Sequence, residues 1–304
     1  MKLVIFVLQL LRGWPLPLLR TVGTGFGYIL WALLARRRHV VLVNLQLCFP
    51  NLSAQERDRW VRQVFIYFAQ SFLDRAWLWH GHDIVLRQRL RLMGAVEELQ
   101  GNAPTVLFAP HFVGMDVGWL AMNFLTPENR NYAGIYAEQT NKAMTDWIRV
   151  GRSRHNKGRA LPTQVSNKDG VRGVLKAIQS GSPLYVLPDL NYEPNDSLYI
   201  PFFGIPSATL PILARYAKLG GKNGVPAKVV PIVTRMTSKG YDIEIHPAWQ
   251  NYPSGSAPAN LEADTRRMNQ ELEQWIRTMP AQYYWVHRRF KDQPNGQASP
   301  YKND

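Results

Sequence analysis

One stretch in the first half of the chain decides the fold, and it reads Thr105-Val106-Leu107-Phe108-Ala109-Pro110-His111-Phe112-Val113-Gly114-Met115-Asp116. Its apolar run from Val106 to Ala109 has turn-prone residues on both sides, which is typical of a buried strand. An apolar helix is predicted to follow at 117–124. A strand, a turn and a helix in this order predict an α/β unit, with His111 in the turn after the strand.

His111 and Asp116 are a candidate catalytic pair. Residues five apart on one helix point about 140° away from each other, so the two can meet only if His111 lies in the turn and Asp116 near the helix start. Gly114 can adopt the unusual backbone conformation that such a turn needs. A histidine oriented by a carboxylate is a candidate general base. The spacing alone fits a structural histidine equally well, because His287 and Asp292 repeat it beside a polar tail, where solvated side chains are expected.

Composition limits the class of protein. The chain has 304 residues and is rich in apolar and aromatic side chains, which excludes a disordered protein and allows one large domain or two small ones. Its net charge of +14 indicates an anionic partner: nucleic acid, an anionic membrane, a phosphorylated substrate or an acidic protein. The single cysteine, Cys48, excludes an internal disulfide and is expected to be a small buried hydrophobe.

Residues 1–38 are expected to anchor the protein in a membrane. The run from Gly13 to Ala35 carries one charge, Arg20, and is long enough to span the hydrocarbon core if that side chain reaches an interface. The arginines at 36–38 favour a cytoplasmic position for that end. A buried N-terminal helix pair of a soluble domain is the alternative. Residues 39–291 are expected to form the main domain, and residues 292–304 a flexible tail.

The rest of the chain predicts an α/β fold with a mixed, largely parallel sheet flanked by helices. Ser53 and Glu56 form a capping box that starts a helix with an apolar stripe, whose arginines, Arg75 among them, are expected to be mostly solvated. Strand-like and helix-like runs then alternate. The strands are expected at 105–109, 132–137, 184–187, 228–234 and 241–246, and the helices at 117–124, 141–150, 170–179, 209–218 and 261–278.

Two polar stretches extend the candidate site. The loop that contains Arg152 and Arg154 is either an exposed basic loop or a clamp for anionic groups and developing oxyanion charge. Asp189 ends a predicted strand, and strand ends facing one side of an α/β sheet are where ligands collect, so His111 and Asp189 are expected to share a rim. The sequence contains no serine elbow, Walker lysine motif, dinucleotide fingerprint or zinc-protease motif, and no metal or cofactor site is expected.

These motifs occur in the order found in a known family. They are the His111 stretch, the 151–154 loop, Pro188-Asp189, Pro201-Phe202-Phe203, and the segments 44–50 and 284–291. Together they resemble the late acyltransferases of lipid A biosynthesis in Gram-negative bacteria, within the wider glycerolipid acyltransferase superfamily, over about residues 1–291. The resemblance implies a glycerol-3-phosphate acyltransferase-like fold. It also implies transfer of an acyl chain from acyl carrier protein to a hydroxyl group of a lipid A precursor, at the cytoplasmic face of the inner membrane.

The resemblance also assigns residues and partners. By position, His111 would be the general base and Asp116, where many members carry Glu, its orienting partner. Arg152, Arg154 and Asp189 would bind substrate, with no metal or cofactor. The partners would be acyl carrier protein, a phosphorylated glycolipid acceptor and membrane lipids. A hydroxyl that attacks a thioester needs a base but no side-chain nucleophile, and a positive surface suits an acidic donor and a phosphorylated acceptor.

Other functions stay open at the level of sequence. One alternative is an acyltransferase of the same fold that uses another membrane lipid as acceptor, and another is a non-catalytic protein that binds anionic lipid through its basic face. A nucleic-acid-binding protein is disfavoured, because the cations are spread among apolar segments and no nucleic-acid-binding fold is recognised.

Overall fold

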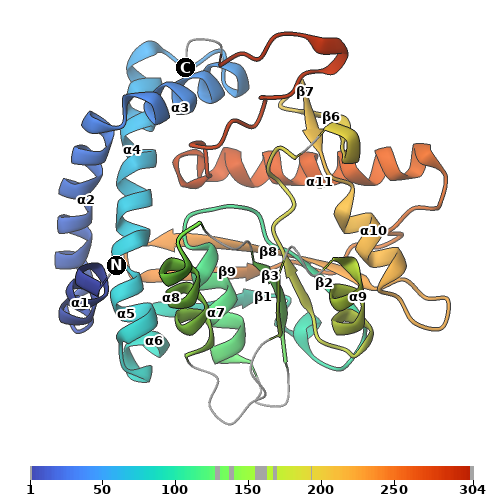
Figure 1. Ribbon diagram of the computed structural model, residues 1–304, viewed down its shortest axis with the longest axis horizontal. Helices are drawn as coiled ribbons and strands as arrows, with labels where there is room; N and C mark the ends of the chain where they lie inside the picture. Colours follow the sequence, from blue (N-terminus) through green and yellow to red (C-terminus); the bar gives the residue numbers. More distant parts are fainter. Residues whose placement is uncertain are drawn as a thin grey trace.

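A seven-stranded sheet forms the centre of the computed structural model, which describes residues 2–126, 131–136, 140–154, 163–166, 170–192 and 194–301 (Figure 1). The strand order is β1-β9-β8-β2-β5-β3-β4. Among the strand pairs described in this sheet, one is antiparallel, β8 with β9, and the others are parallel. The predicted mixed, largely parallel α/β sheet is confirmed. The strands are β1 (Leu90–Gly94), β2 (Thr105–Phe108), β3 (Ala133–Tyr136), β4 (Thr163–Ser166), β5 (Leu184–Val186), β8 (Lys228–Thr237) and β9 (Gly240–Ile245).

The helices and a small hairpin complete the fold. The predicted strands and helices from residue 105 onwards agree with the structure to within three residues at each end. The helix expected at 209–218 begins at Ile212, because residues 205–209 form a strand of the hairpin. The hairpin pairs β6 (Leu198–Phe202) with β7 (Ile205–Thr209). The sequence patterns predicted neither this hairpin nor strands β1 and β4. The helices are α1 (Lys2–Leu11), α2 (Leu16–Leu33), α3 (Ala35–Cys48), α4 (Ala54–Leu73), α5 (Arg75–His80), α6 (Asp83–Arg89), α7 (Met115–Leu125), α8 (Lys142–Ser153), α9 (Val171–Gln179), α10 (Ile212–Leu219) and α11 (Pro258–Thr278).

Strand β2 is buried on both faces, which explains its unbroken apolar sequence. Alternate side chains of a strand point to opposite faces, and here Val106 and Phe108 join one hydrophobic cluster while Leu107 and Ala109 join another. The first cluster includes residues of α10 and α11, and the second includes residues of α5 and α7. Helices therefore cover both faces of the sheet and leave the ends of its strands for the polar residues that follow them.

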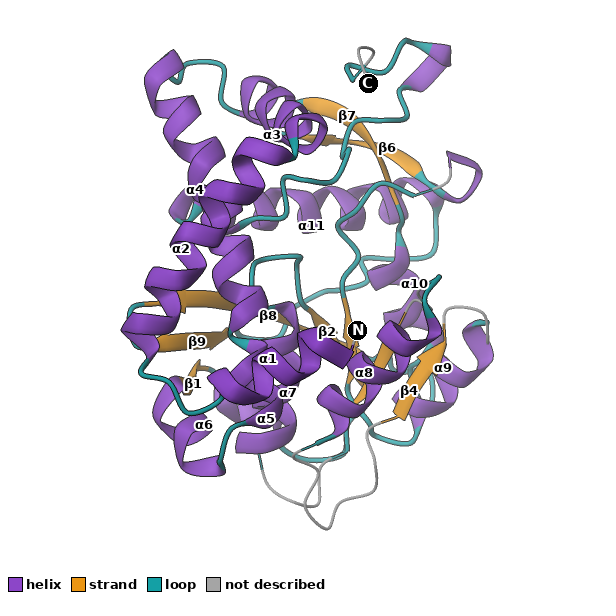
Figure 2. Cartoon of the chain, turned by 60° about the vertical axis from the view of Figure 1, so that its left-hand side comes forward, coloured by secondary structure: helices purple, strands orange, loops and turns teal. Residues whose placement is uncertain are grey.

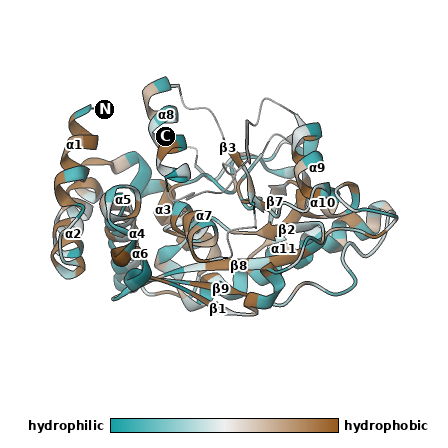
Figure 3. Ribbon diagram, turned by 90° about the horizontal axis from the view of Figure 1, so that it is seen from below, coloured by the Kyte–Doolittle hydropathy of each residue, from teal (hydrophilic) through white to brown (hydrophobic). Residues whose placement is uncertain are grey.

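Helix α2 lies along α4 at one end of the molecule (Figures 1 and 2). Two glycines make the close approach possible: a Cβ atom on Gly23 would lie 2.8 Å from Cγ of Gln70, and one on Gly27 would lie 2.5 Å from Cα of Ile66. The outer side of α1 and α2 is apolar and exposed (Figure 3). No single described helix is long and apolar enough to cross a membrane, whereas α2 and α3 together, bent by 93°, meet that length and composition.

Tyr301 connects the segment after residue 291 to the rest of the fold. It is buried, and its hydroxyl donates to the side chain of Asn44 on α3 and accepts from the backbone N–H of Phe290. The flexible tail expected at 292–304 stays a prediction. Two local predictions near α3 and α4 are confirmed, since Cys48 is a buried free thiol and Ser53 and Glu56 form a reciprocal capping box.

Candidate active site

His111 and Asp189 meet where two neighbouring parallel strands end. His111 follows β2 and Asp189 follows β5, and the carboxyl ends of parallel strands open on the same edge of a sheet. The Nδ1 atom of His111 lies 2.8 Å from Oδ1 of Asp189, and the backbone N–H of His111 donates to Oδ2 at 3.0 Å. The predicted shared rim is therefore a direct hydrogen-bonded contact.

The contact defines the state of both side chains. Burial alone would raise the pKa of Asp189, but the charge and hydrogen bonds of His111 outweigh burial and lower that pKa below its ordinary value. An ionised carboxylate can only accept, so the proton of a neutral His111 must sit on Nδ1. The lone pair of Nε2 is then left to take a proton. The His111 side chain is 13% exposed, so solvent and substrate still reach it.

Asp116 is held by two arginines. It lies in the first turn of α7, after Gly114 with φ of 81° and ψ of 24°, the left-handed conformation that the turn requires. Arg152 of α8 donates to its Oδ1 from Nε at 2.9 Å and from a terminal nitrogen at 2.7 Å, and Arg75 of α5 donates to Oδ2 at 2.5 Å. Burial alone would raise the pKa of Asp116, but Arg152 and Arg75 outweigh it and lower the pKa to about 2.

The structure corrects the expected pairing of His111 with Asp116. His111 does lie in the turn and Asp116 near the helix start, as the pairing required, but both oxygens of Asp116 bind guanidinium groups. The carboxylate that contacts His111 comes instead from the next strand, as Asp189. Arg75 was expected to be solvated and is partly buried in this network.

His111 opens into a cleft of about 610 Å³. The walls combine apolar side chains with Arg149 and Arg152, so the cleft can hold an apolar group and a negative charge together. Ligand clefts of small-molecule enzymes have this size and composition. Its lining includes His111, Met115, Ile135, Arg149, Arg152, Val174, Val186, Leu187, Leu190, Tyr192, Ile212 and Tyr216.

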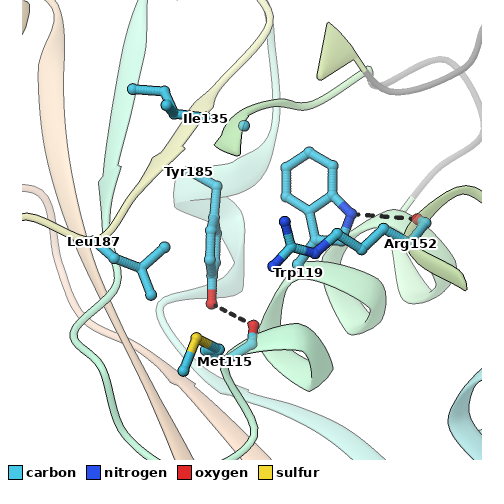
Figure 4. Close-up of a pocket in the computed structure, with 7 residues that line it drawn as sticks. Met115, Trp119, Ile135, Arg152, Tyr185 and Leu187 are labelled. Carbon is cyan, nitrogen blue, oxygen red and sulfur yellow. Dashed lines mark hydrogen bonds between the residues drawn. The ribbon is translucent and has the colours of Figure 1, made fainter. Parts of the chain in front are cut away.

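A smaller apolar pocket of about 30 Å³ continues from the cleft, with Met115, Ile135, Arg152 and Leu187 common to both (Figure 4). Trp119, Gly134 and Tyr185 complete its lining. Hydrogen bonds fix its walls. The hydroxyl of Tyr185 donates to the carbonyl of Met115, and the indole N–H of Trp119 donates to the carbonyl of Arg152, each at 3.2 Å.

Other polar residues lie where the sequence patterns did not place them. Arg154 donates to the carbonyl of Trp79 and lines a separate pocket, away from His111. His287 was expected to be solvated, but its Nε2 accepts from the backbone N–H of Asn191 at 2.9 Å. Burial, aided by the charge of Arg289, lowers the pKa of His287 to about 4. This histidine is therefore neutral near pH 7.

Tyr284 is a neighbour of the site that the sequence patterns did not identify. Its ring stacks on that of His111, with centroids 6.0 Å apart, and its backbone N–H donates to the carbonyl of His111 at 3.0 Å. The sequence does show an aromatic run at 283–285, but only the tertiary contact reveals that Tyr284 of this run packs against His111. Among the residues that the structure describes, no group of three or more His, Cys, Asp or Glu side chains is arranged to hold a metal ion.

Comparison with known proteins identifies the family. The model of the bacterial lipid A biosynthesis acyltransferase family matches residues 1–292. The chain belongs to this family. It is 30% identical over 303 residues to a lipid A biosynthesis lauroyltransferase of Escherichia coli K12, covering 97% of this chain and 92% of that relative. It is 27% identical to the lipid A biosynthesis palmitoleoyltransferase of the same organism, covering 94% and 89%.

The comparison with solved structures gives a weak alignment. The 1-acyl-sn-glycerophosphate acyltransferase of Thermotoga maritima aligns with a TM-score of 0.38 and 12% identity, covering 86% of this chain and 97% of that one.

Proposed function

We propose that this lipid A acyltransferase moves a fatty acyl chain from the thioester of acyl carrier protein to a hydroxyl group of a lipid A precursor, with His111 as general base. The observation that carries the proposal is the hydrogen bond between His111 Nδ1 and buried Asp189, which leaves Nε2 basic in a mixed polar and apolar cleft. The family supplies the class of reaction and acceptor.

The reaction needs one base that returns its proton. Nε2 of His111 takes the proton from the acceptor hydroxyl as its oxygen attacks the thioester carbonyl, and a tetrahedral oxyanion forms. When the intermediate collapses, the carbon–sulfur bond breaks and the imidazolium returns the proton to the leaving thiolate. Asp189 stabilises the imidazolium between these steps, and a positioned base contributes about 10²–10⁴ in rate.

Arg152 is suited to stabilise negative charge in the cleft. Asp116 accepts hydrogen bonds from two nitrogens of Arg152, at 2.9 and 2.7 Å. These bonds fix the guanidinium group of Arg152 on the wall of the cleft that His111 also lines. Arginine remains charged throughout and keeps donors beyond those bound to the carboxylate. The proposed role of Asp116 is therefore to hold Arg152, with Arg75, rather than to orient the histidine.

The small pocket beyond the cleft is proposed to receive the end of the acyl chain. It is largely apolar and shares four wall residues with the His111 cleft. Burial of the chain end in this pocket would stabilise the bound acyl chain by about 0.8 kcal/mol for each CH₂ group removed from water. The depth of this pocket would then limit the length of the chain transferred.

Residues 1–38 are proposed to attach the enzyme to the inner membrane at its cytoplasmic face, ahead of an acyltransferase domain that spans residues 39–291. A contiguous group of exposed apolar residues of this kind is typical of a membrane or protein contact. The arginines at 36–38 follow the group directly, as expected for a cytoplasmic end. The exposed apolar side chains are Leu3, Val4, Phe6, Val7, Leu10, Trp14, Leu18, Val22, Phe26, Tyr28, Ile29, Leu33 and Leu34.

The test is a reconstituted reaction. Purified protein is incubated in neutral detergent micelles with acyl carrier protein thioesters of several chain lengths and a lipid A precursor, and the products are measured by mass spectrometry. The expected product is the precursor with one added acyl ester. No transfer to the precursor, together with transfer to a phospholipid acceptor in a parallel reaction, would contradict the proposed acceptor.

A further inference from the structure

A second pocket beside the active site is strongly basic. It has a volume of about 330 Å³ and is lined by three cations, Arg37, Arg288 and Lys291, and one carboxylate, Asp292. Three positive charges against one negative charge leave +2. We call this site the basic pocket, and Asn191, Tyr192 and His287 complete its lining.

The cations come from segments that are far apart in sequence and are held together by polar contacts. Arg37 on α3 donates to the carbonyl of Val286 at 3.3 Å, and Asn44, farther along α3, donates to the carbonyls of Trp285 and His287 at 2.7 and 2.9 Å. These contacts bring the start of α3 against the segment that carries Arg288 and Lys291. The basic pocket is therefore assembled by the tertiary fold and is more than a local run of charge.

A third segment closes the pocket through Asn191. Its backbone N–H donates to Nε2 of His287 at 2.9 Å, and its side-chain nitrogen donates to Asp292 at 2.6 Å. The bond from Asn191 fixes Asp292 at the edge of the pocket. The side-chain oxygen of Asn191 is buried and has no hydrogen-bond partner within the described residues, so it is available to a donor such as a sugar hydroxyl.

The start of α3 adds to the positive potential. Arg36, Arg37 and Arg38 occupy the first turn of this helix, which contains no acidic residue. The amino end of a helix is already partly positive, so cations there are unfavourable in the absence of an anion. An anion bound in the basic pocket would offset this repulsion.

The basic pocket adjoins the catalytic cleft. Tyr192 lines both, and the short segment from Asp189 to Tyr192 runs from the partner of His111 to the basic pocket. On the other side, Tyr284 stacks on His111 and lies three residues before His287. A ligand that occupied both sites would need an anionic group close to the reacting hydroxyl.

We propose that the basic pocket binds a phosphate group of the glycolipid acceptor and so places the acceptor hydroxyl at His111. The inference rests on the proposed function, because it assumes that the acceptor is a phosphorylated lipid A precursor. A concave pocket of this size suits one phosphate group and its neighbouring sugar better than the broad face of an acidic protein. Arginine and lysine provide the charge-assisted hydrogen bonds by which phosphates are usually recognised.

The experiment compares two acceptors that differ only in phosphate. The rate of acyl transfer is measured in neutral detergent micelles, at one saturating concentration of acyl donor, with the phosphorylated precursor and with the same precursor after phosphatase treatment. The readout is the ratio of kcat/KM for the two acceptors, in which any general damage to the enzyme cancels. Wild-type protein is expected to prefer the phosphorylated acceptor.

Removing the cations should reduce that preference. The variants are Lys291→Gln and the Arg288→Gln, Lys291→Gln double variant, and the expected fall in the ratio is about tenfold for each cation removed, since hydrogen bonds to charged groups are the stronger ones. Lys222→Gln and Lys239→Gln are the matched controls, because they remove the same charge in turns away from both pockets and should keep the wild-type ratio.

A wild-type ratio in the double variant would overturn the inference. A parallel arm distinguishes bulk phospholipid as the occupant, by sedimentation with phosphatidylcholine vesicles with and without phosphatidylglycerol. If the double variant lost binding to the anionic vesicles while its ratio in micelles remained that of wild type, the site would hold membrane phosphate rather than the acceptor. Wild-type protein that acylates neither form of the precursor would instead contradict the proposed function.

Discussion

Two buried carboxylates in the active site have different partners and therefore different tasks. Asp189 contacts the imidazole of His111, and Asp116 binds the guanidinium groups of Arg152 and Arg75. Both have lowered pKa values and are ionised at neutral pH. Their roles can be separated by replacing each with asparagine, which keeps the shape and removes the charge.

Replacing Asp189 should affect the chemical step. Asp189→Asn removes the negative charge that stabilises the imidazolium and one of the two oxygens that accept from His111, so kcat should fall by about 10²–10⁴ while KM for both substrates changes little. Steady-state kinetics with the acyl donor and the precursor measure this. A kcat within a few-fold of wild type would show that Asp189 does not orient the base.

Replacing Asp116 should affect stability as well as activity. Asp116→Asn leaves Arg75 and Arg152 partly buried without their carboxylate, which should lower the free energy of unfolding by roughly 3 kcal/mol, measured by urea denaturation. Replacement at a solvated aspartate, Asp58→Asn, should change it little, because the Asp58–Arg62 pair is exposed. Equal stability of the two variants would contradict the arginine-holding role.

The same pair gives the protein an acid-sensitive component of stability. The pKa of Asp116 is about 2 in the folded protein, against an ordinary value of 3.8. A group whose pKa is depressed by folding contributes stability that is present above the unfolded value and is lost as pH falls through the folded one. Wild-type protein should therefore lose stability more steeply than Asp116→Asn between about pH 4 and pH 2, in urea titrations at each pH. Parallel curves would contradict this.

At the scale of single elements, the sequence predicted what depends on local pattern. The apolar run of β2, the left-handed turn at Gly114 and the capping box at Ser53 are short-range features, and the structure has them. The pairing of His111 with Asp189 joins residues 78 positions apart and depends on β5 lying beside β2. The spacing of His111 and Asp116 could not show that the oxygens of Asp116 are occupied, because the arginines that bind them come from α5 and α8.

Strand β3 should set the length of the transferred chain. Ile135→Ala removes a wall of the small pocket and should shift the preferred acyl donor to a longer chain, while Gly134→Ala should shift it to a shorter one. The second effect is expected because a Cβ atom at Gly134 would lie 2.7 Å from Trp119 and force that ring to move. Competition among acyl carrier protein thioesters, with products resolved by mass, measures both. Unchanged preference in both variants would place the chain end elsewhere.

The contact between α2 and α4 should depend on one glycine and tolerate change at its neighbour. Gly27→Ala places a Cβ atom 2.5 Å from Cα of Ile66, so it should separate the helices and destabilise the protein by about 1–3 kcal/mol. Gly25→Ala is the matched control, because its Cβ would meet nothing within 4 Å, and it should be neutral or stabilising by up to about 1 kcal/mol. Thermal unfolding of both variants in detergent tests the difference, and equal losses would contradict it.

For the molecule as a whole, one end is apolar and the catalytic cleft and basic pocket carry positive charge. The exposed apolar residues of α1 and α2 suit a lipid surface, and the cationic pockets suit a phosphorylated acceptor lying in that surface. Composition already indicated an anionic partner through the net charge of +14. It could not show which cations gather into pockets, since Arg37 and Lys291 meet only in the folded chain.

Membrane association should depend on the apolar end. Leu3→Glu with Phe6→Glu should move the protein from the vesicle fraction to the supernatant, because each side chain contributes about 1.5–3 kcal/mol on burial and a charge opposes insertion. Val225→Glu is the control, since Val225 is equally exposed in a turn outside this end. Sedimentation with phospholipid vesicles provides the readout. If Val225→Glu lost vesicle binding while the Leu3→Glu, Phe6→Glu variant kept it, the membrane contact would lie at the surface around Val225 rather than at the apolar end.

The role of His111 is tested most directly by the rate of a single turnover in His111→Ala, with enzyme in excess over acyl carrier protein thioester and precursor. The alanine variant should fold, bind vesicles and retain its small pocket, and its rate of acyl transfer should fall by at least about 10²-fold at pH 7. A folded His111→Ala protein that transfers the acyl chain at nearly the wild-type rate would contradict His111 as the base.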